Sequence, residues 1–193
     1  MDDKKFDPKK LQKLNNPERL LDTPPEEIWK HLNLNIGELD TFIDIGAGTG
    51  FFSVPFVKYI KNGKIYACDI SELMVNWMTS NICPKYPNII PIRMEENTII
   101  LQDELADLVY MINLHHELNS PEQMLKEAYR LLKRAGKIFI VDWKKEEMPQ
   151  GPPVEIRYKP EKVQDQLLKA GFEDVNIYNE MQKHFLLVAR KDS

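Results

Sequence analysis

Two adjacent histidines and a glutamate, His115, His116 and Glu117, stand near the middle of the 193-residue chain. Imidazole nitrogens and carboxylates can ligate a metal ion, take a proton from a substrate, or bond to nearby backbone. The spacing is not that of an H-E-x-x-H zinc site, and no third ligand stands nearby in the sequence, which disfavours a metal site. Neighbouring side chains on a strand point to opposite faces, so at most one of the two histidines should face a cleft.

A glycine-rich turn followed by an acid is the second group that could do chemistry. Gly46, Gly48 and Gly50 are spaced G-x-G-x-G, and glycine lets a ligand approach the backbone closely. Position 51 is Phe, so the third glycine is not where a pyrophosphate-binding loop needs it. Asp69 ends the next predicted strand, where a carboxylate can accept hydrogen bonds from both hydroxyls of a ribose. A tight turn would explain the glycines alone, but the loop together with Asp69 favours a nucleoside-containing ligand.

These groups need a scaffold, and the hydrophobic pattern predicts alternating strands and helices. The run 106–114 is nearly all apolar, as expected of a central parallel strand buried on both faces. We predict an α/β fold, with helices on both faces of the sheet and ligands bound at the carboxyl ends of the strands. Strands are expected at 41–45, 63–69, 88–93, 106–114, 136–143, 174–179 and 184–191, and helices at 51–60, 71–81, 120–133 and 159–171.

The first part of the chain, residues 1–38, predicts a helical arm that packs as a lid on an α/β domain formed by residues 39–193. Thr23, Pro24 and Glu26 have the spacing of an N-cap, a first helical position and a capping box. The apolar face of this helix would carry Ile28, Trp29 and Leu32.

The motifs, taken in this order and spacing, resemble those of the class I S-adenosylmethionine-dependent methyltransferases. The similarity covers roughly residues 38–190 and rests on FIDIGAGTGFF, IYACDIS, IRMEENTIILQDELADLVYMINLHHEL and MLKEAYRLLKRAGKIFIVDW. It implies a doubly wound, Rossmann-like sheet of seven mainly parallel strands in the order 3-2-1-4-5-7-6. The chain departs from the family at residues 94–96, where Met-Glu-Glu stands for the more usual G-D-A.

The resemblance implies S-adenosylmethionine as the cofactor and a set of residues that would bind it. The glycine loop and Asp44 would lie at its amino-acid end, Asp69 at the ribose, and the residues after Asp69 at the adenine. Either Glu95 or Glu96 would accept from the adenine amine, and the choice between them stays open. The whole set is Asp44, Gly46, Ala47, Gly48, Gly50, Asp69, Ile70, Met74, Glu95, Glu96 and Asn113.

The resemblance also assigns a role to one histidine. In the related phosphoethanolamine methyltransferases, a histidine at the position of His115 sits beside the substrate. His115 is therefore the candidate catalytic base or substrate-orienting group, and His116 the structural one. A second interpretation, in which both only satisfy local backbone at the end of a strand, stays open. No N-P-P-Y motif follows the fourth strand, which disfavours methylation of nucleobase or amide nitrogen.

The leading prediction is methyl transfer to a small-molecule acceptor by in-line displacement. A non-catalytic or partner-dependent cofactor-binding module is the alternative, and a nicotinamide oxidoreductase comes third. The composition, 42% hydrophobic and 29% charged, indicates a globular protein, and the net charge of −4 gives no general attraction for nucleic acid or a membrane surface. Two cysteines without metal spacing fit the cytoplasm. We expect a monomer or homodimer.

Overall fold

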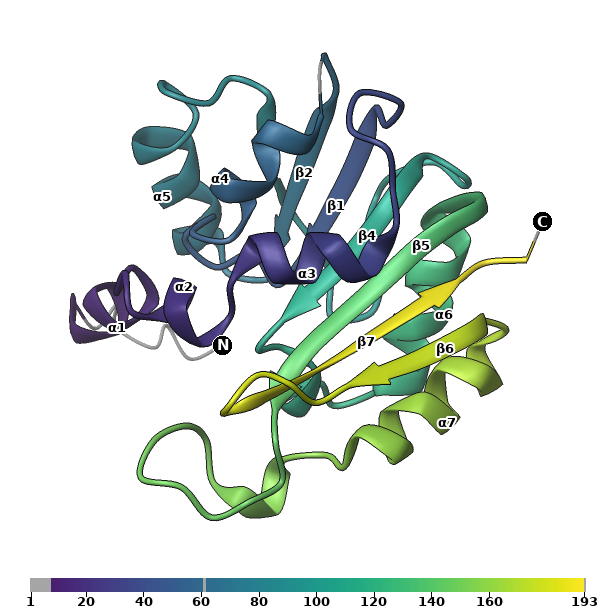
Figure 1. The fold of residues 1–193 in the computed structure, drawn as a ribbon. Coiled ribbons are helices and arrows are strands. Elements are labelled where there is room, and N and C mark those ends of the chain that lie inside the picture. Colours follow the sequence, from purple (N-terminus) through teal and green to yellow (C-terminus); the bar gives the residue numbers. More distant parts are fainter. Residues whose placement is uncertain (1–7, 61, 193) are drawn as a thin grey trace.

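A computed structural model describes residues 8–60 and 62–192, which are organised around a seven-stranded sheet (Figure 1). The strand order is β3-β2-β1-β4-β5-β7-β6, which confirms the predicted fold and order. Strands β1 to β5 are parallel, and β7 is antiparallel to both β5 and β6. The strands are β1 (Thr41–Ile45), β2 (Lys64–Asp69), β3 (Ile89–Arg93), β4 (Ala106–Ile112), β5 (Leu132–Trp143), β6 (Glu173–Tyr178) and β7 (His184–Arg190).

The direction of the strand order reverses between β1 and β4, which lie side by side in the middle of the sheet. Because parallel strands all end at one edge, the segments that follow β1 and β4 diverge there and leave a crevice between them. The glycine loop follows β1 and the histidine pair follows β4. The topology therefore brings together two motifs about 65 residues apart in the sequence.

Helices cover both faces of the sheet (Figure 1). On β4, Leu108 and Tyr110 pack into one core cluster, and Val109 and Met111 into the other. This strict alternation, with both faces buried, explains the apolar run of the fourth strand. The first face is covered by α3 (Pro25–Leu32), α4 (Ser53–Phe56) and α5 (Glu72–Asn81), and the second by α6 (Pro121–Leu131) and α7 (Pro160–Ala170).

The N-terminal segment forms three short helices, of which the third joins the core. The predicted face of α3 is buried, and Trp29 stacks on Tyr59 with ring centroids 3.8 Å apart. The predicted N-cap at Thr23 is wrong, because α3 begins at Pro25 and Pro24 occupies the cap position. A residue before proline is held out of the helical region, so Pro24 stays extended. The preceding helices are α1 (Pro8–Leu14) and α2 (Arg19–Asp22), and the first seven residues of the predicted arm lie outside the described residues.

The predicted continuous helix over residues 51–60 is wrong. The segment forms α4 followed by a 3₁₀ turn, Val57–Tyr59. A 3₁₀ turn places residues three apart on one face, and Phe56 and Tyr59 are both buried against the same cluster. Burial of two aromatic rings at this spacing therefore accounts for the tighter winding. No helix in residues 8–60 and 62–192 is long and apolar enough to cross a membrane.

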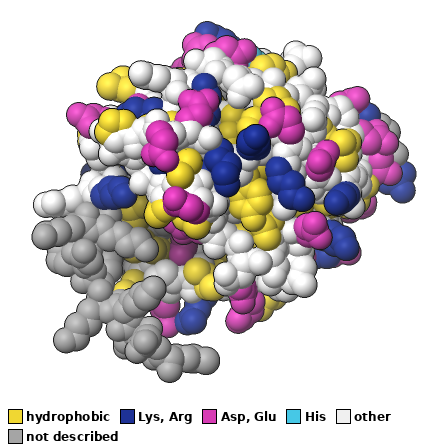
Figure 2. All heavy atoms as spheres, turned by 90° about the horizontal axis from the view of Figure 1, so that it is seen from below, with side chains coloured by type: hydrophobic (Ala, Val, Ile, Leu, Met, Phe, Trp, Pro, Cys, Tyr) yellow, Lys and Arg dark blue, Asp and Glu magenta, His cyan; other side chains and the backbone are white. Residues whose placement is uncertain are grey.

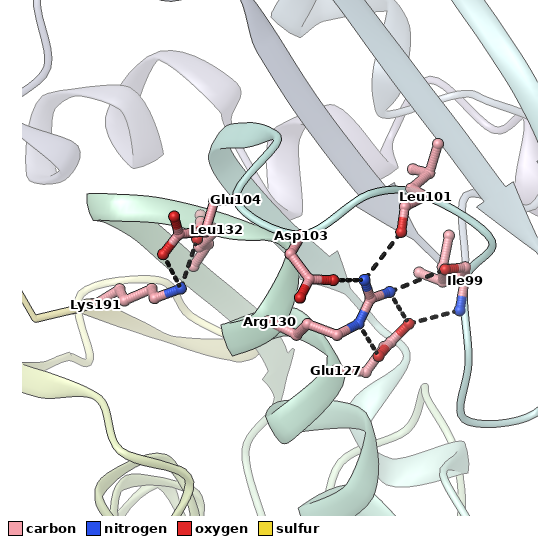
Figure 3. A network of polar contacts seen from close by, with 8 residues as sticks. All are labelled: Ile99, Leu101, Asp103, Glu104, Glu127, Arg130, Leu132 and Lys191. Carbon is pink, nitrogen blue, oxygen red and sulfur yellow. Dashed lines mark hydrogen bonds and ion pairs between the residues drawn. The ribbon is translucent and has the colours of Figure 1, made fainter.

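Arg130 on α6 anchors the loop that leads into β4 (Figure 3). Its guanidinium donates to the carbonyls of Ile99 and Leu101 at 3.0 and 2.9 Å and pairs with Asp103 and Glu127. The Glu127 carboxylate also accepts from the backbone N–H of Ile99 at 2.7 Å. Although burial acts in the opposite direction, these bonds lower the pKa of Glu127. The network fixes a loop that has no regular secondary structure of its own.

Replacing Arg130 with methionine is expected to lower the free energy of unfolding by ~1–3 kcal/mol, because two carbonyls and a half-buried carboxylate lose their partner. Urea denaturation measures the loss. Arg134→Met is the matched control, since Arg134 is exposed near the start of β5. Equal effects of the two substitutions would contradict the anchoring role.

Candidate functional site

The glycine loop between β1 and α4 is fixed to the neighbouring strand. The backbone N–H groups of Gly46 and Ala47 both donate to the carbonyl of Cys68, at 2.8 and 2.9 Å. Gly46 has φ of +73°, and a Cβ atom there would lie 2.6 Å from Leu114 Cδ1. The left-handed backbone conformation favours glycine at this position, and a Cβ atom would also displace the Leu114 side chain.

Asp69, at the end of β2, completes the loop. Its Oδ2 accepts from the Gly48 N–H at 2.7 Å, and its Oδ1 accepts from the Ser71 N–H at 2.8 Å. One carboxylate thus joins the glycine loop to the start of α5. The side chain borders the same cavity as the loop, which places an acceptor where the predicted ribose would lie.

Asp44, the last polar residue of β1, is buried beneath this loop. Its Oδ2 accepts from the Ser53 hydroxyl at 2.5 Å. Burial raises the pKa of Asp44 to about 7, against the opposing hydrogen bond from Ser53 and the attraction of Arg19. A carboxyl group with such a pKa gains from a cation placed beside it.

A cavity of about 470 Å³ opens over these residues at the carboxyl edge of the sheet. Such a volume is typical of small-molecule and cofactor sites. Among the described residues its charged side chains are four carboxylates and one guanidinium, a set that favours a cationic ligand over one that carries phosphates. The lining residues are Leu14, Arg19, Asp44, Gly46, Ala47, Gly48, Thr49, Phe52, Asp69, Ile70, Ser71, Met74, Met94, Glu96, Ile112, Asn113, Leu114, Glu117, Leu118 and Asn119.

Nine of the eleven residues predicted to bind a cofactor line this cavity, and Gly50 and Glu95 do not. Gly50 lies behind the loop, where a Cβ atom would meet Met78 Sδ of α5 at 3.2 Å. Of the two glutamates, Glu96 is the one at the cavity, held by Asn119 Nδ2 at 2.6 Å. The packing of the segment after β3 therefore favours Glu96 over Glu95 at the predicted adenine end.

Asn113 supplies a polar atom that suits a bound ligand. Its backbone takes the left-handed conformation, φ 58°, while its N–H donates to the carbonyl of Val141 at 2.8 Å. Its Oδ1 is buried and has no hydrogen-bond partner among the described residues. Since buried polar atoms are nearly always satisfied, this oxygen fits a ligand that carries a donor.

Arg19 of α2 was missed by the sequence reasoning. Its guanidinium lies over the Phe52 ring, 4.7 Å from the centroid, and donates to the carbonyl of Leu14. Burial lowers the pKa of Arg19 to about 10, while Asp44 raises it. No local pattern marks an arginine some 25 residues before the glycine loop as part of a site. Arg19, from the N-terminal helices, is therefore the one cation at this cavity among the residues that the structure describes.

The two histidines, in the 3₁₀ turn His115–Glu117, point in different directions. His115 is fully buried and does not line the cavity over the glycine loop. Its Nε2 lies 2.9 Å from Gln166 Oε1 of α7, and its ring packs edge-on to Tyr158. Burial lowers the pKa of His115. Its Nδ1 is buried and has no hydrogen-bond partner among the described residues.

His116 is held by Asp142 at the end of β5. Asp142 Oδ1 lies 2.7 Å from His116 Nδ1, and its Oδ2 accepts from the His116 N–H at 2.9 Å. A buried carboxylate beside Nδ1 keeps the proton on that nitrogen and leaves Nε2 as the acceptor. The other ring nitrogen, Nε2, lies 3.7 Å from Glu117 Oε1, so the ring of His116 is flanked by two carboxylates.

A second cavity, of about 580 Å³, lies beside His116. It is formed by the loop that follows β5 and by the start of α7. Arg157 is buried and donates to loop carbonyls, including those of Pro152 and Glu146 at 2.9 Å. The lining residues are His116, Lys145, Glu155, Ile156, Arg157, Tyr158, Lys159 and Lys162. Within the described part of the chain, no three His, Cys, Asp or Glu residues cluster as metal ligands would.

Comparisons with known proteins agree with this geometry. A family model described as the methyltransferase domain matches residues 43–140. The crystal structure of a SAM-dependent methyltransferase from Aquifex aeolicus is 36% identical, with a TM-score of 0.87 over 96% of this chain and 99% of that one. The uncharacterized methyltransferase YdaC of Bacillus subtilis (strain 168) is 27% identical over 149 residues, 77% of this chain and 80% of that protein.

A further relative carries out a different reaction. The tRNA(Phe) (4-demethylwyosine(37)-C(7)) aminocarboxypropyltransferase of Methanocaldococcus jannaschii is 28% identical over 127 residues. The match covers 65% of this chain and 49% of that enzyme, so the chain spans about half of its length.

Proposed function

The chain belongs to the methyltransferase domain family and uses S-adenosylmethionine, and on this premise we propose that it transfers the methyl group to a small-molecule acceptor by in-line displacement. The single observation that carries the choice of acceptor is the second cavity beside His116, whose volume of about 580 Å³ suits a small molecule. The net charge of −4 supports it as well, because it gives no general attraction for nucleic acid.

The residues of the first cavity fit the cofactor. When bound, S-adenosylmethionine supplies an electrophilic methyl group on a cationic sulfonium. Asp69 would accept from the ribose hydroxyls, Asp44 would face the ammonium group, and Asn113 Oδ1 would receive a donor that it lacks among the described residues. The excess of carboxylates stabilises a cationic ligand, and this argues against the nicotinamide oxidoreductase considered above.

The affinity for S-adenosylhomocysteine is expected to fall as the pH drops below about 7, the value to which burial raises the pKa of Asp44. A neighbouring ammonium stabilises only the ionised carboxylate, so below this pKa binding must first remove a proton. Linkage then predicts a roughly tenfold weaker complex at pH 6 than at pH 8. Isothermal titration across this range measures it. The Asp44→Asn variant should bind S-adenosylhomocysteine weakly at every pH. An affinity of the unaltered protein that does not change with pH would contradict a contact between Asp44 and the ammonium group.

His116 is the proposed proton acceptor for an acceptor atom that carries a proton. Its Nε2 is left as the acceptor by the bond between Nδ1 and Asp142, and its ring lines the second cavity. When the acceptor atom forms its bond to the methyl carbon, its proton passes to Nε2 and the thioether leaves as the neutral product. His115, the base proposed from the resemblance, keeps a supporting role here through Gln166 and Tyr158.

Transfer of a radioactive methyl group tests the proposal. The protein is incubated with methyl-labelled S-adenosylmethionine and either a metabolite extract or bulk tRNA. Label in the small-molecule fraction is expected. Label only in tRNA would contradict the acceptor class and place the chain nearer to its archaeal relative. Binding of S-adenosylhomocysteine without transfer to either pool would favour the alternative, a non-catalytic or partner-dependent module.

A further inference from the structure

The two cavities share one wall but differ in the sign of their charge. The segment 113–119 contributes Asn113, Leu114 and Glu117 to the cofactor cavity and His116 to the second cavity. Four carboxylates and one guanidinium line the first, whereas four cationic side chains and one carboxylate line the second. On a chain with a net charge of −4, this concentration of cations is a local feature and not a reflection of the average.

The cations of the second cavity are placed at its rim. Lys145 comes from the loop after β5, Lys159 precedes α7 and Lys162 stands in the first turn of α7; all three are exposed. Figure 2 views the side to which this loop projects, where dark blue Lys and Arg side chains lie across the middle of the face with magenta Asp and Glu side chains between and around them. An exposed lysine ammonium has three donors on a flexible stem, which can turn toward an anion.

The loop that forms the cavity is held in place without a ligand. The Arg157 guanidinium donates to the carbonyls of Pro152 and Glu146, each at 2.9 Å, and lies over the Trp143 ring at 5.6 Å. Lys145 Nζ donates to the carbonyls of Arg157 and Glu155 at 2.7 and 3.1 Å. These bonds preorganise the rim, which lowers the entropy cost of binding.

We propose that this cavity binds the carboxylate or phosphate of a small-molecule methyl acceptor, with Lys159 and Lys162 facing the anion and His116 facing the atom that receives the methyl group. The opposite charges of the two cavities orient such an acceptor, since its anionic end is repelled by the carboxylates of the cofactor cavity and attracted to the lysines. That the bound anion is part of a methyl acceptor rests on the proposed function. That the second cavity binds an anion does not depend on the proposed function.

The anion site is tested with two probes, inorganic phosphate and succinate, and with glycerol as an uncharged control. Each is titrated into protein saturated with S-adenosylhomocysteine at constant ionic strength, and the nuclear magnetic resonance signals of the His116 ring report occupancy. We expect both anions, but not glycerol, to shift these signals. Lys162→Gln and Lys159→Gln should each weaken the binding by about fivefold or more, as expected for loss of a charge-assisted contact.

Lys169→Gln is the matched control, because Lys169 is exposed on the same helix and does not line the cavity. Equal affinities in the Lys162 and Lys169 variants, or equal shifts with glycerol, would overturn the anion site. Tighter binding of a short oligoribonucleotide than of either probe, weakened by the same two variants, would overturn the small-molecule assignment.

A methyl-transfer assay distinguishes failure of the anion site from failure of the proposed function. If the anions bind as expected but no metabolite is labelled, the function fails and the anion site stands. If uncharged metabolites are labelled at a rate that Lys162→Gln leaves unchanged, the function stands and the anionic class of acceptor is overturned.

Discussion

Replacing Asp69 by asparagine is expected to remove almost all the stabilisation that S-adenosylhomocysteine gives to this protein. The carboxylate accepts from both the Gly48 and the Ser71 N–H groups, and an amide has only one oxygen to offer. One N–H would face an NH₂ group, and the ribose would lose a charged acceptor. Hydrogen bonds to charged groups contribute ~1.5–3 kcal/mol each, so a loss of affinity of ~100-fold or more follows.

Thermal or urea denaturation with and without ligand measures this loss. At a ligand concentration of ~100 times its dissociation constant, the unaltered protein should gain ~2.7 kcal/mol, and the variant less than ~0.5 kcal/mol. NAD is expected to give neither protein a gain. A gain with NAD alone would refute the assignment of the cofactor cavity.

Asp107 provides a matched control at the opposite edge of the sheet. Its Oδ2 likewise accepts from two backbone N–H groups, those of Asp40 and Thr41, at 2.9 and 3.0 Å. Asp107→Asn should lower the stability of the ligand-free protein yet leave the gain from S-adenosylhomocysteine unchanged. If both variants lose the gain, the effect of Asp69 is general destabilisation and not loss of a ligand contact.

The second large effect is expected at His116. His116→Gln should lower the turnover number ~10²–10⁴-fold, the usual contribution of a positioned general base, for an acceptor that must lose a proton. The affinity for S-adenosylhomocysteine should stay within about threefold, because His116 does not line the cofactor cavity. Asp142→Asn should reduce turnover as well, since the amide no longer fixes the proton on Nδ1. Single-turnover methyl transfer and ligand titration separate the two quantities.

His115→Gln decides between the two histidines. The ring of His115 is buried against Tyr158 and Gln166, so its replacement should lower the melting temperature while retaining most of the turnover. The reverse result, with turnover lost at His115 and kept at His116, would favour the role that the family resemblance assigns to His115.

The scaffold could be predicted from the sequence because its signals are local. The apolar run of β4 and the alternation of strands with helices reflect burial on two faces, and they predicted the α/β fold with helices on both faces that is observed. The doubly wound strand order was implied by the family resemblance. The spacing of Gly46 and Gly48 and the acid at Asp69 likewise follow from the geometry of one turn and one strand end.

Where local signals compete, the sequence was less informative. Thr23 has the spacing of an N-cap, but the two prolines that follow it shift the helix start. Glu95 and Glu96 are neighbours of the same type, and only the packing of the segment after β3 places Glu96 at the cavity.

The sequence by itself thus predicted the sheet, the glycine loop and the edge of the sheet at which the first cavity lies. Only the tertiary structure placed Arg19 at the first cavity, gave His115 and His116 different partners, and formed the cationic cavity beside His116. The physical reason is that strand periodicity and turn chemistry act between near neighbours. By contrast, contacts between segments distant in the chain decide the direction of a side chain in a 3₁₀ turn. Such contacts also bring α2, the loop after β5 and α7 together with that turn.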